Sequence, residues 1–120
     1  MSRREKIYER LALLEAEFHK ATSRHVERVA TGANSDFFQT DRFSEFHNGY
    51  LLPQRRPIEA LLELGEEINH LRALLDEPPS DAVLSLESAC REATDYRNPH
   101  RLGSKRLAQR VLATLRERAS

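Results

Sequence analysis

Apolar residues recur along this chain at intervals of three and four residues, the spacing that places them on one face of an α-helix. The first such run covers about residues 3–30 and has the narrow heptad spacing of a coiled-coil seam. Its apolar positions are Ile7, Leu11, Leu14, Phe18, Ala21 and His25. The run ends before Gly32, a residue suited to the left-handed turn that closes a helix. The pattern therefore predicts one long helix.

A second run begins at Pro57, a residue favoured in the first turn of a helix, and continues to about Asp76. It repeats the heptad spacing through Leu61, Leu64, Ile68, Leu71 and Leu75. Gly65 lies inside this run, where glycine costs about 1 kcal/mol relative to alanine. We expect a close approach by a neighbouring helix to compensate for that cost. The matching seams of the two runs predict an antiparallel helical hairpin.

Two shorter helices are expected after the hairpin. One fits residues 81–96, with Ser80 as its cap and small apolar side chains along one face. The other begins at Pro99 or after Gly103-Ser104, and its apolar positions are Leu107, Ala108, Val111, Leu112 and Leu115. No segment alternates with the period of a strand, so we expect no sheet. The sequence predicts an all-α, four-helix bundle-like domain built on the long antiparallel hairpin.

The connection at residues 34–56 is irregular and contains five of the eight Phe and Tyr residues of the chain. Because a structureless loop of this length is uncommon in a compact domain, we expect a short extra helix near residues 41–47, capped by Thr40. The aromatic side chains can form an exposed anchor for a partner protein, or they can fold back as a cap on the bundle. The candidate partner-binding residues are Phe37, Phe38, Phe43, Phe46 and Tyr50.

Length and composition fit one domain over residues 1–120. A hydrophobic fraction of 39% with 32% charged residues is typical of a helical protein with solvated outer faces. The single cysteine, Cys90, cannot form an internal disulfide, and the N-terminus shows no signal-peptide pattern. No apolar stretch approaches the roughly 20 residues of a membrane-spanning helix. We therefore expect a cytoplasmic protein.

Charge is zero overall but is sorted along the chain. Residues 58–96 carry two basic and ten acidic side chains, whereas residues 97–120 carry seven basic and one acidic. A basic helix can neutralise the phosphates of a nucleic acid, or it can lie against the acidic second helix. The candidate nucleic-acid contacts are Arg101, Lys105, Arg106 and Arg110.

Little in the sequence indicates catalysis or metal binding. Cys90 lies among small apolar residues, which is the pattern of a buried cysteine. Glu67 and His70 have the spacing of half a di-iron site, but the chain has no second Glu-x-x-His pair. The four glycines are scattered and form no phosphate-binding loop. We expect no catalytic residues, no cofactor and no bound metal.

The preferred hypothesis is a non-enzymatic protein-interaction or regulatory protein that uses the bundle surface or the aromatic segment. The alternative is a nucleic-acid-associated protein that uses the basic last helix. The first helix is longer than the second, so part of its apolar seam remains uncovered. Pairing of two copies in a homodimer would bury that part, and two-fold dimers are the commonest oligomers.

Overall fold

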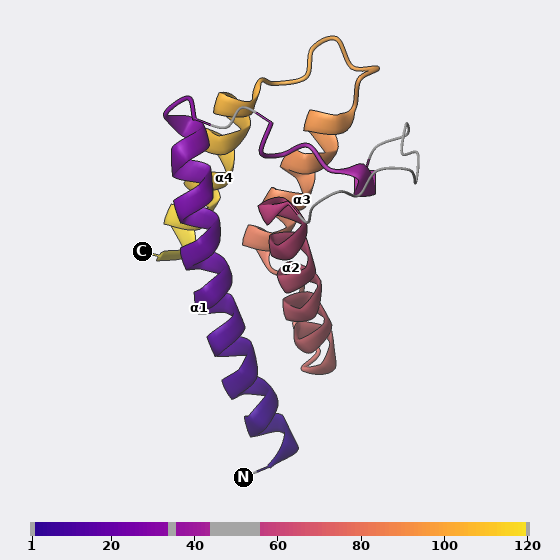
Figure 1. Cartoon of the computed structure of the whole chain (residues 1–120). Helices are drawn as coiled ribbons and strands as arrows, with labels where there is room; N and C mark the ends of the chain where they lie inside the picture. The colour runs from indigo at the N-terminus through magenta and orange to yellow at the C-terminus, as the bar shows by residue number, and fades with distance from the viewer. Residues whose placement is uncertain (1, 34–35, 44–55, 120) are drawn as a thin grey trace.

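The computed structural model describes residues 2–33, 36–43 and 56–119. They form α1 (Arg3–Ala30), a short 3-10 turn η1 (Asp41–Phe43), α2 (Pro57–Leu74), α3 (Asp81–Thr94) and α4 (Ser104–Ala119). The direction alternates: α1 rises from the N-terminus, α2 returns beside it, α3 rises again and α4 descends (Figure 1). The described residues contain no strand, and the predicted all-α, bundle-like class is confirmed.

Local signals set the helix ends. The hydroxyls of Ser2 and Ser80 each accept a hydrogen bond from the backbone N–H three residues later, at 3.1 and 3.4 Å. Pro57 occupies the first turn of α2. Gly32 follows the last turn of α1 and has a φ of 94°. A residue with a side chain would be strained in this left-handed conformation, which glycine adopts freely. Of the two starts weighed for the last helix, the structure has the later one, at Ser104.

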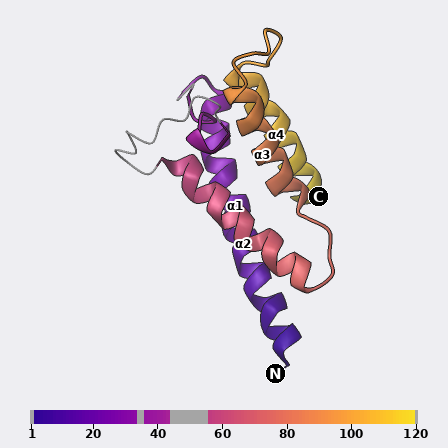
Figure 2. The same cartoon turned by 90° about the vertical axis from the view of Figure 1, so that its right-hand side faces the viewer.

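The helices close into a ring of contacts. α1 packs against both α4 and α2, and α3 packs against the same two helices. Figure 2 shows α3 and α4 side by side, with α1 and α2 on the other side of the molecule. The α1–α2 pair is therefore one side of a closed bundle. The packing of α1 involves α4 at least as much as it involves α2.

The positions of α1 that are buried shift to a different face of the helix halfway along its length. The N-terminal part of the predicted seam is buried at Leu11, Leu14 and Phe18. Its last two positions, Ala21 and His25, are only half-buried. The buried positions there are Thr22, Val26 and Val29. A straight α-helix drifts by about 20° per heptad from a 3.5-residue repeat, so a single heptad seam over 28 residues was wrong for the C-terminal half.

Gly65 lies at a close approach of helices. A Cβ atom added to it would be 2.8 Å from Val83 Cγ1 on α3 and 3.6 Å from Phe18 Cε2 on α1. The first of these separations is shorter than real Cβ atoms allow, so α3 can come this near only because position 65 has no side chain. The predicted compensation for a mid-helix glycine is confirmed.

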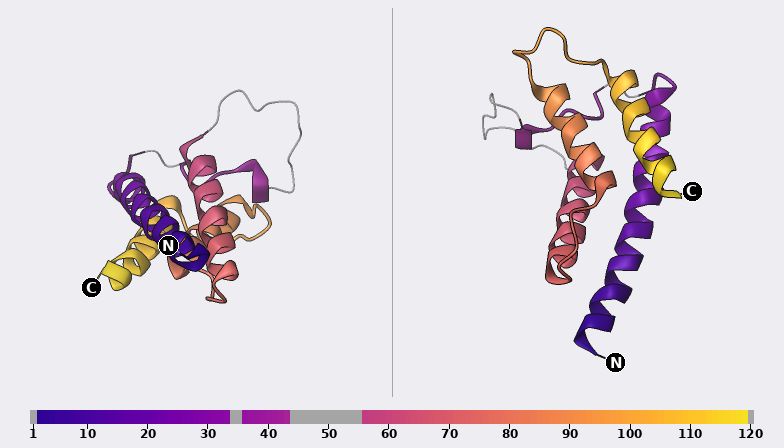
Figure 3. Two further views of the ribbon diagram at one scale, coloured as in Figure 1. Left: turned by 90° about the horizontal axis from the view of Figure 1, so that it is seen from below. Right: turned by 180° about the vertical axis from the view of Figure 1, so that it is seen from behind.

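The N-terminal part of α1 extends beyond the end of α4 (Figure 3, right). There it contacts the C-terminal end of α2: the Arg4 guanidinium donates to the Leu75 carbonyl at 3.5 Å. The Tyr8 hydroxyl lies 3.4 Å from the Glu77 carboxylate. The uneven helix lengths predicted from the sequence therefore leave the start of α1 projecting beyond α4.

Candidate interaction groove between α1 and α2

The segment 36–43 packs onto the bundle through its phenylalanines. Phe37 is 3% exposed and Phe38 is fully buried. The Phe37 ring stacks on His25 of α1 at 5.4 Å between ring centroids and meets Phe38 edge-on at 5.2 Å. Of the two roles weighed for these rings, the core cap is therefore correct. Phe37 and Phe38 are not exposed anchors, because burial in the core already removes their surface from water.

The remaining aromatic candidates differ in position. Phe43 is half-buried, and the Arg91 guanidinium of α3 lies 4.8 Å from its ring centroid. Phe46 and Tyr50 lie outside the described residues, as does the C-terminal part of the short helix expected at 41–47. Only the 3-10 turn η1 is described there, and the Thr40 hydroxyl accepts from the Arg42 N–H at 3.2 Å.

The four basic candidates on and before α4 do not form one free cationic face. Arg101 donates to the Ala93 carbonyl at 3.1 Å, and its guanidinium lies 4.6 Å from the Tyr96 ring centroid. Arg110 lies 3.6 Å from the Glu92 carboxylate of α3. Lys105 and Arg106 are exposed. Two of the four candidates are thus engaged within the molecule.

The acidic side chains of α2 have partners away from α4. Glu66 pairs with Arg42 at 2.7 Å, and Glu67 pairs with Arg10 of α1 at 3.1 Å. Glu59 accepts a hydrogen bond from the Thr40 hydroxyl. The alternative in which the basic last helix lies against the acidic second helix is therefore not seen for Arg110, Glu66 and Glu67, whose partners lie on other elements.

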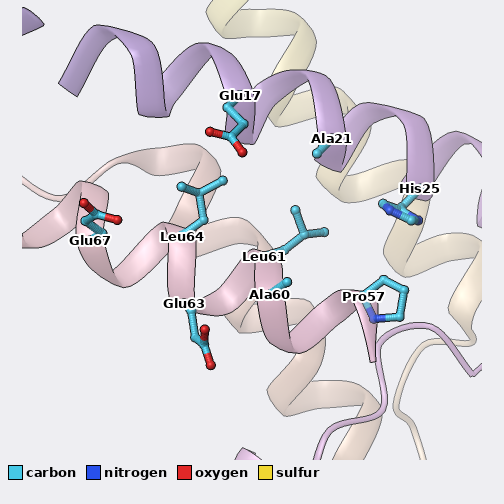
Figure 4. Close-up of a pocket in the computed structure, with 9 residues that line it drawn as sticks. All are labelled: Glu17, Ala21, His25, Pro57, Ala60, Leu61, Glu63, Leu64 and Glu67. Atoms are coloured by element: carbon cyan, nitrogen blue, oxygen red, sulfur yellow. The ribbon is translucent and has the colours of Figure 1, made fainter. Parts of the chain in front are cut away.

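An open hollow of about 400 Å³ lies between the C-terminal half of α1 and the N-terminal half of α2. Leu61 and Leu64 of α2 both point toward α1 across it, Leu61 toward Ala21 and Leu64 toward Glu17 (Figure 4). Glu17 extends from α1 into the same space, whereas Glu63 points away from it (Figure 4). His25 and Pro57 close one end, and Ala60 and Glu67 complete the lining. The hollow combines an apolar floor with carboxylates at its edge.

A second hollow of about 420 Å³ lies at the other end of the helix pair. Its apolar lining consists of Ile7, Leu74 and Leu75, and Leu74 is 50% exposed. Arg3 and Arg4 supply its charge. This hollow is therefore apolar like the first one, but its charged edge is basic.

Both hollows lie on the same side of the α1–α2 pair. Residues seven apart stand almost above one another on a helix. Arg3, Arg10 and Glu17 therefore form one row on α1, and Ala60, Glu67 and Leu74 form one row on α2. The Arg10–Glu67 ion pair joins the two rows between the hollows. We call this surface the α1–α2 groove, lined by Arg3, Ile7, Glu17, Ala21, Ala60, Leu64, Glu67 and Leu74.

His25 is the groove residue whose titration is perturbed. Partial burial lowers its pKa from the ordinary value of 6.5, and the charges of Arg24 and Arg28 lower it further. Its ring is also held by the stack on Phe37. The imidazole therefore favours its neutral form, which fits the apolar floor of the groove.

Within the described residues, Cys90 is not activated and the metal-ligating side chains do not cluster. Burial, together with the charges of Glu59 and Glu87, raises the pKa of the Cys90 thiol to about 12, so the thiol is not an activated nucleophile. No group of three His, Cys, Asp or Glu side chains within the described residues is placed to hold a metal ion. The Glu67 carboxylate, one member of the Glu-x-x-His pair, forms an ion pair with Arg10.

Among the residues of the α1–α2 groove, Ile7, Ala21 and Leu64 were predicted only as positions of the helix seams. Ala21, Leu64 and Leu71 belong to the predicted seams but are half-buried, and they mark the strip that the bundle leaves partly uncovered. The seven-residue spacing of Ala60, Glu67 and Leu74 was the signal that could have revealed it. No described helix is long and apolar enough to cross a membrane.

Comparison with known proteins returned no match to any family model, curated protein or solved structure.

Proposed function

We propose that this chain is a non-enzymatic protein-interaction protein that holds an apolar segment of its partner in the α1–α2 groove. The observation that carries the proposal is the pair of open apolar hollows on one side of two long helices. An amphipathic helix binds such a groove by placing its apolar face against the floor and its polar edges against the charged rim. Half-buried Leu64 and exposed Leu74 supply the apolar contacts.

Position 60 provides the test, because Ala60 lines the groove and is exposed. A photo-crosslinking side chain at position 60 should capture a defined protein in cells, identified by mass spectrometry. Ser88 on α3 is exposed as well and serves as the matched control position. Ala60→Arg should abolish capture reported from a crosslinker at position 64, while helicity and melting temperature stay unchanged. If crosslinkers at positions 60 and 88 captured the same proteins equally well, the α1–α2 groove would not be the binding site.

The nucleic-acid alternative retains less support. Its cationic face reduces to Lys105 and Arg106, since Arg101 and Arg110 have partners inside the molecule. Each phosphate contact contributes to the salt dependence of binding, so two free cations give weak binding with a shallow salt slope. Fluorescence anisotropy with a duplex oligonucleotide at low salt measures this directly for the wild type and for Lys105→Glu/Arg106→Glu.

A further inference from the structure

The two helices that border the α1–α2 groove carry opposite charges on their outer surfaces. On α1, the rows beside the groove contain five basic and two acidic residues: Arg3, Arg10, Glu17 and Arg24, then Lys6, Lys20 and Glu27. On α2, the exposed charged residues are Glu63, Glu66 and Glu67. The one basic residue within α2, Arg72, is turned toward Glu15 at 2.9 Å. The groove therefore has a basic flank on α1 and an acidic flank on α2.

This arrangement is self-complementary under one particular symmetry. A two-fold axis that lies along the groove places α1 of each copy over α2 of the other, at the same height along the helices. The basic flank of one subunit then meets the acidic flank of its partner twice, as an isologous interface requires. A two-fold axis across the helices would instead bring α1 onto α1, where most of the charges repel.

Exposed leucines lie on the same two flanks. Leu13 is 69% exposed and lies between Arg10 and Glu17 on the surface of α1, because residues three and four apart are neighbours on a helix. Leu74 is 50% exposed on α2. Pairing α1 with α2 of a second copy covers both leucines, and it also covers the half-buried floor of the groove at Ala21 and Leu64.

The size of this face also suits a dimer. The 28 residues of α1 span about 42 Å and the 18 residues of α2 about 27 Å, and each helix is about 10 Å across. The α1–α2 face thus covers about 700 Å², close to the roughly 800 Å² that one partner contributes to an interface of standard size. An interface of this area needs no contribution from α3 or α4.

We infer that the partner that occupies the α1–α2 groove is a second copy of this chain, joined by a two-fold axis along the groove with α1 over α2 of the partner. The inference rests on the proposed function, because it names the partner of the same surface. Sedimentation equilibrium of the purified protein should therefore give twice the chain mass of 13.9 kDa.

A charge-swap series tests the pairing of the flanks. Lys20 of α1 lies level with Glu63 of α2, because Ala21 and Leu61 line the same hollow. Lys20→Glu and Glu63→Lys therefore each place like charges opposite one another at two symmetric contacts, so each should raise the dimer dissociation constant by about tenfold or more. The double variant restores opposite charges only if α1 faces α2 of the partner, and its dissociation constant should return close to the wild-type value. Arg116→Glu changes an exposed residue on α4 and is the matched control.

The outcomes separate this inference from the proposed function. A wild-type protein that stays monomeric at all concentrations, yet captures a different protein from position 60, overturns the dimer and leaves the interaction function standing. A dimer whose dissociation constant is unchanged by either single charge reversal overturns the inferred interface. A monomer without specific capture from position 60 overturns both proposals. A dimer weakened by each single change and restored by the pair supports both.

Discussion

Replacing Gly65 with alanine tests how tightly α2 and α3 are packed. Alanine is favoured over glycine by about 1 kcal/mol inside a helix, so the change should stabilise a loosely packed protein. Here the new methyl group would lie 2.8 Å from Val83 Cγ1, and Val83 is itself only 1% exposed. Forcing such a group into a packed core typically costs 1–3 kcal/mol. With about 2 kcal/mol of overpacking, the expected net loss of unfolding free energy is about 1 kcal/mol.

A double-mutant cycle isolates this contact. Val83→Ala removes two buried methyl groups and should cost about 2 kcal/mol by itself. In Gly65→Ala/Val83→Ala the new methyl group has room and the helix-propensity gain is kept, so the expected loss is about 1 kcal/mol. The two single losses sum to about 3 kcal/mol, which gives a coupling of about 2 kcal/mol in favour of the double variant.

Urea unfolding followed by far-ultraviolet circular dichroism measures all four free energies. Gly103→Ala is the control, because a Cβ there meets nothing within 4 Å, and its effect should stay within about 0.5 kcal/mol. If the losses of the two single variants added to within about 0.5 kcal/mol, Val83 would not contact position 65 and the described packing of α3 on α2 would be wrong.

Two further predictions follow from the aromatic segment and the groove. Phe38→Ala should lower the unfolding free energy by about 3–5 kcal/mol, because the ring is fully buried, and unchanged stability in urea would contradict its place in the core. The lowered pKa of His25 means that the unfolded chain binds more protons in the window just below pH 6.5. The stability contributed by neutral His25 is therefore complete above pH 6.5 and is lost as the pH falls through the folded pKa. Urea titrations across that window should show a steeper loss on acidification for the wild type than for His25→Gln, and parallel curves would refute the partial burial.

Features set by short-range chemistry were predictable from the sequence. The cap at Ser80, the turn at Gly32 and the start of α2 at Pro57 each depend on a few neighbouring residues. The close approach at Gly65 was also predictable, because a mid-helix glycine needs a reason that packing supplies. The all-helical class followed from the spacing of apolar residues alone.

Features that depend on which helices meet were not predictable. The buried face of α1 passes from Phe18 to Thr22 because α1 has two neighbours, and the heptad pattern described only one. Composition could not show that Phe38 is buried, since an aromatic anchor and an aromatic cap look alike in sequence. Charge counting likewise missed the hydrogen bond from Arg101 to the Ala93 carbonyl.

The pairing of α1 with α4 has a consequence for biosynthesis. The residues of α1 pack against α4, which is synthesised much later. The first helix therefore leaves the ribosome long before α4 exists. Contacts of such long sequence separation slow folding relative to helical proteins with local contacts. Until α4 has been synthesised, the nascent chain exposes valines that belong to the interior, and exposed apolar surface of this kind favours aggregation.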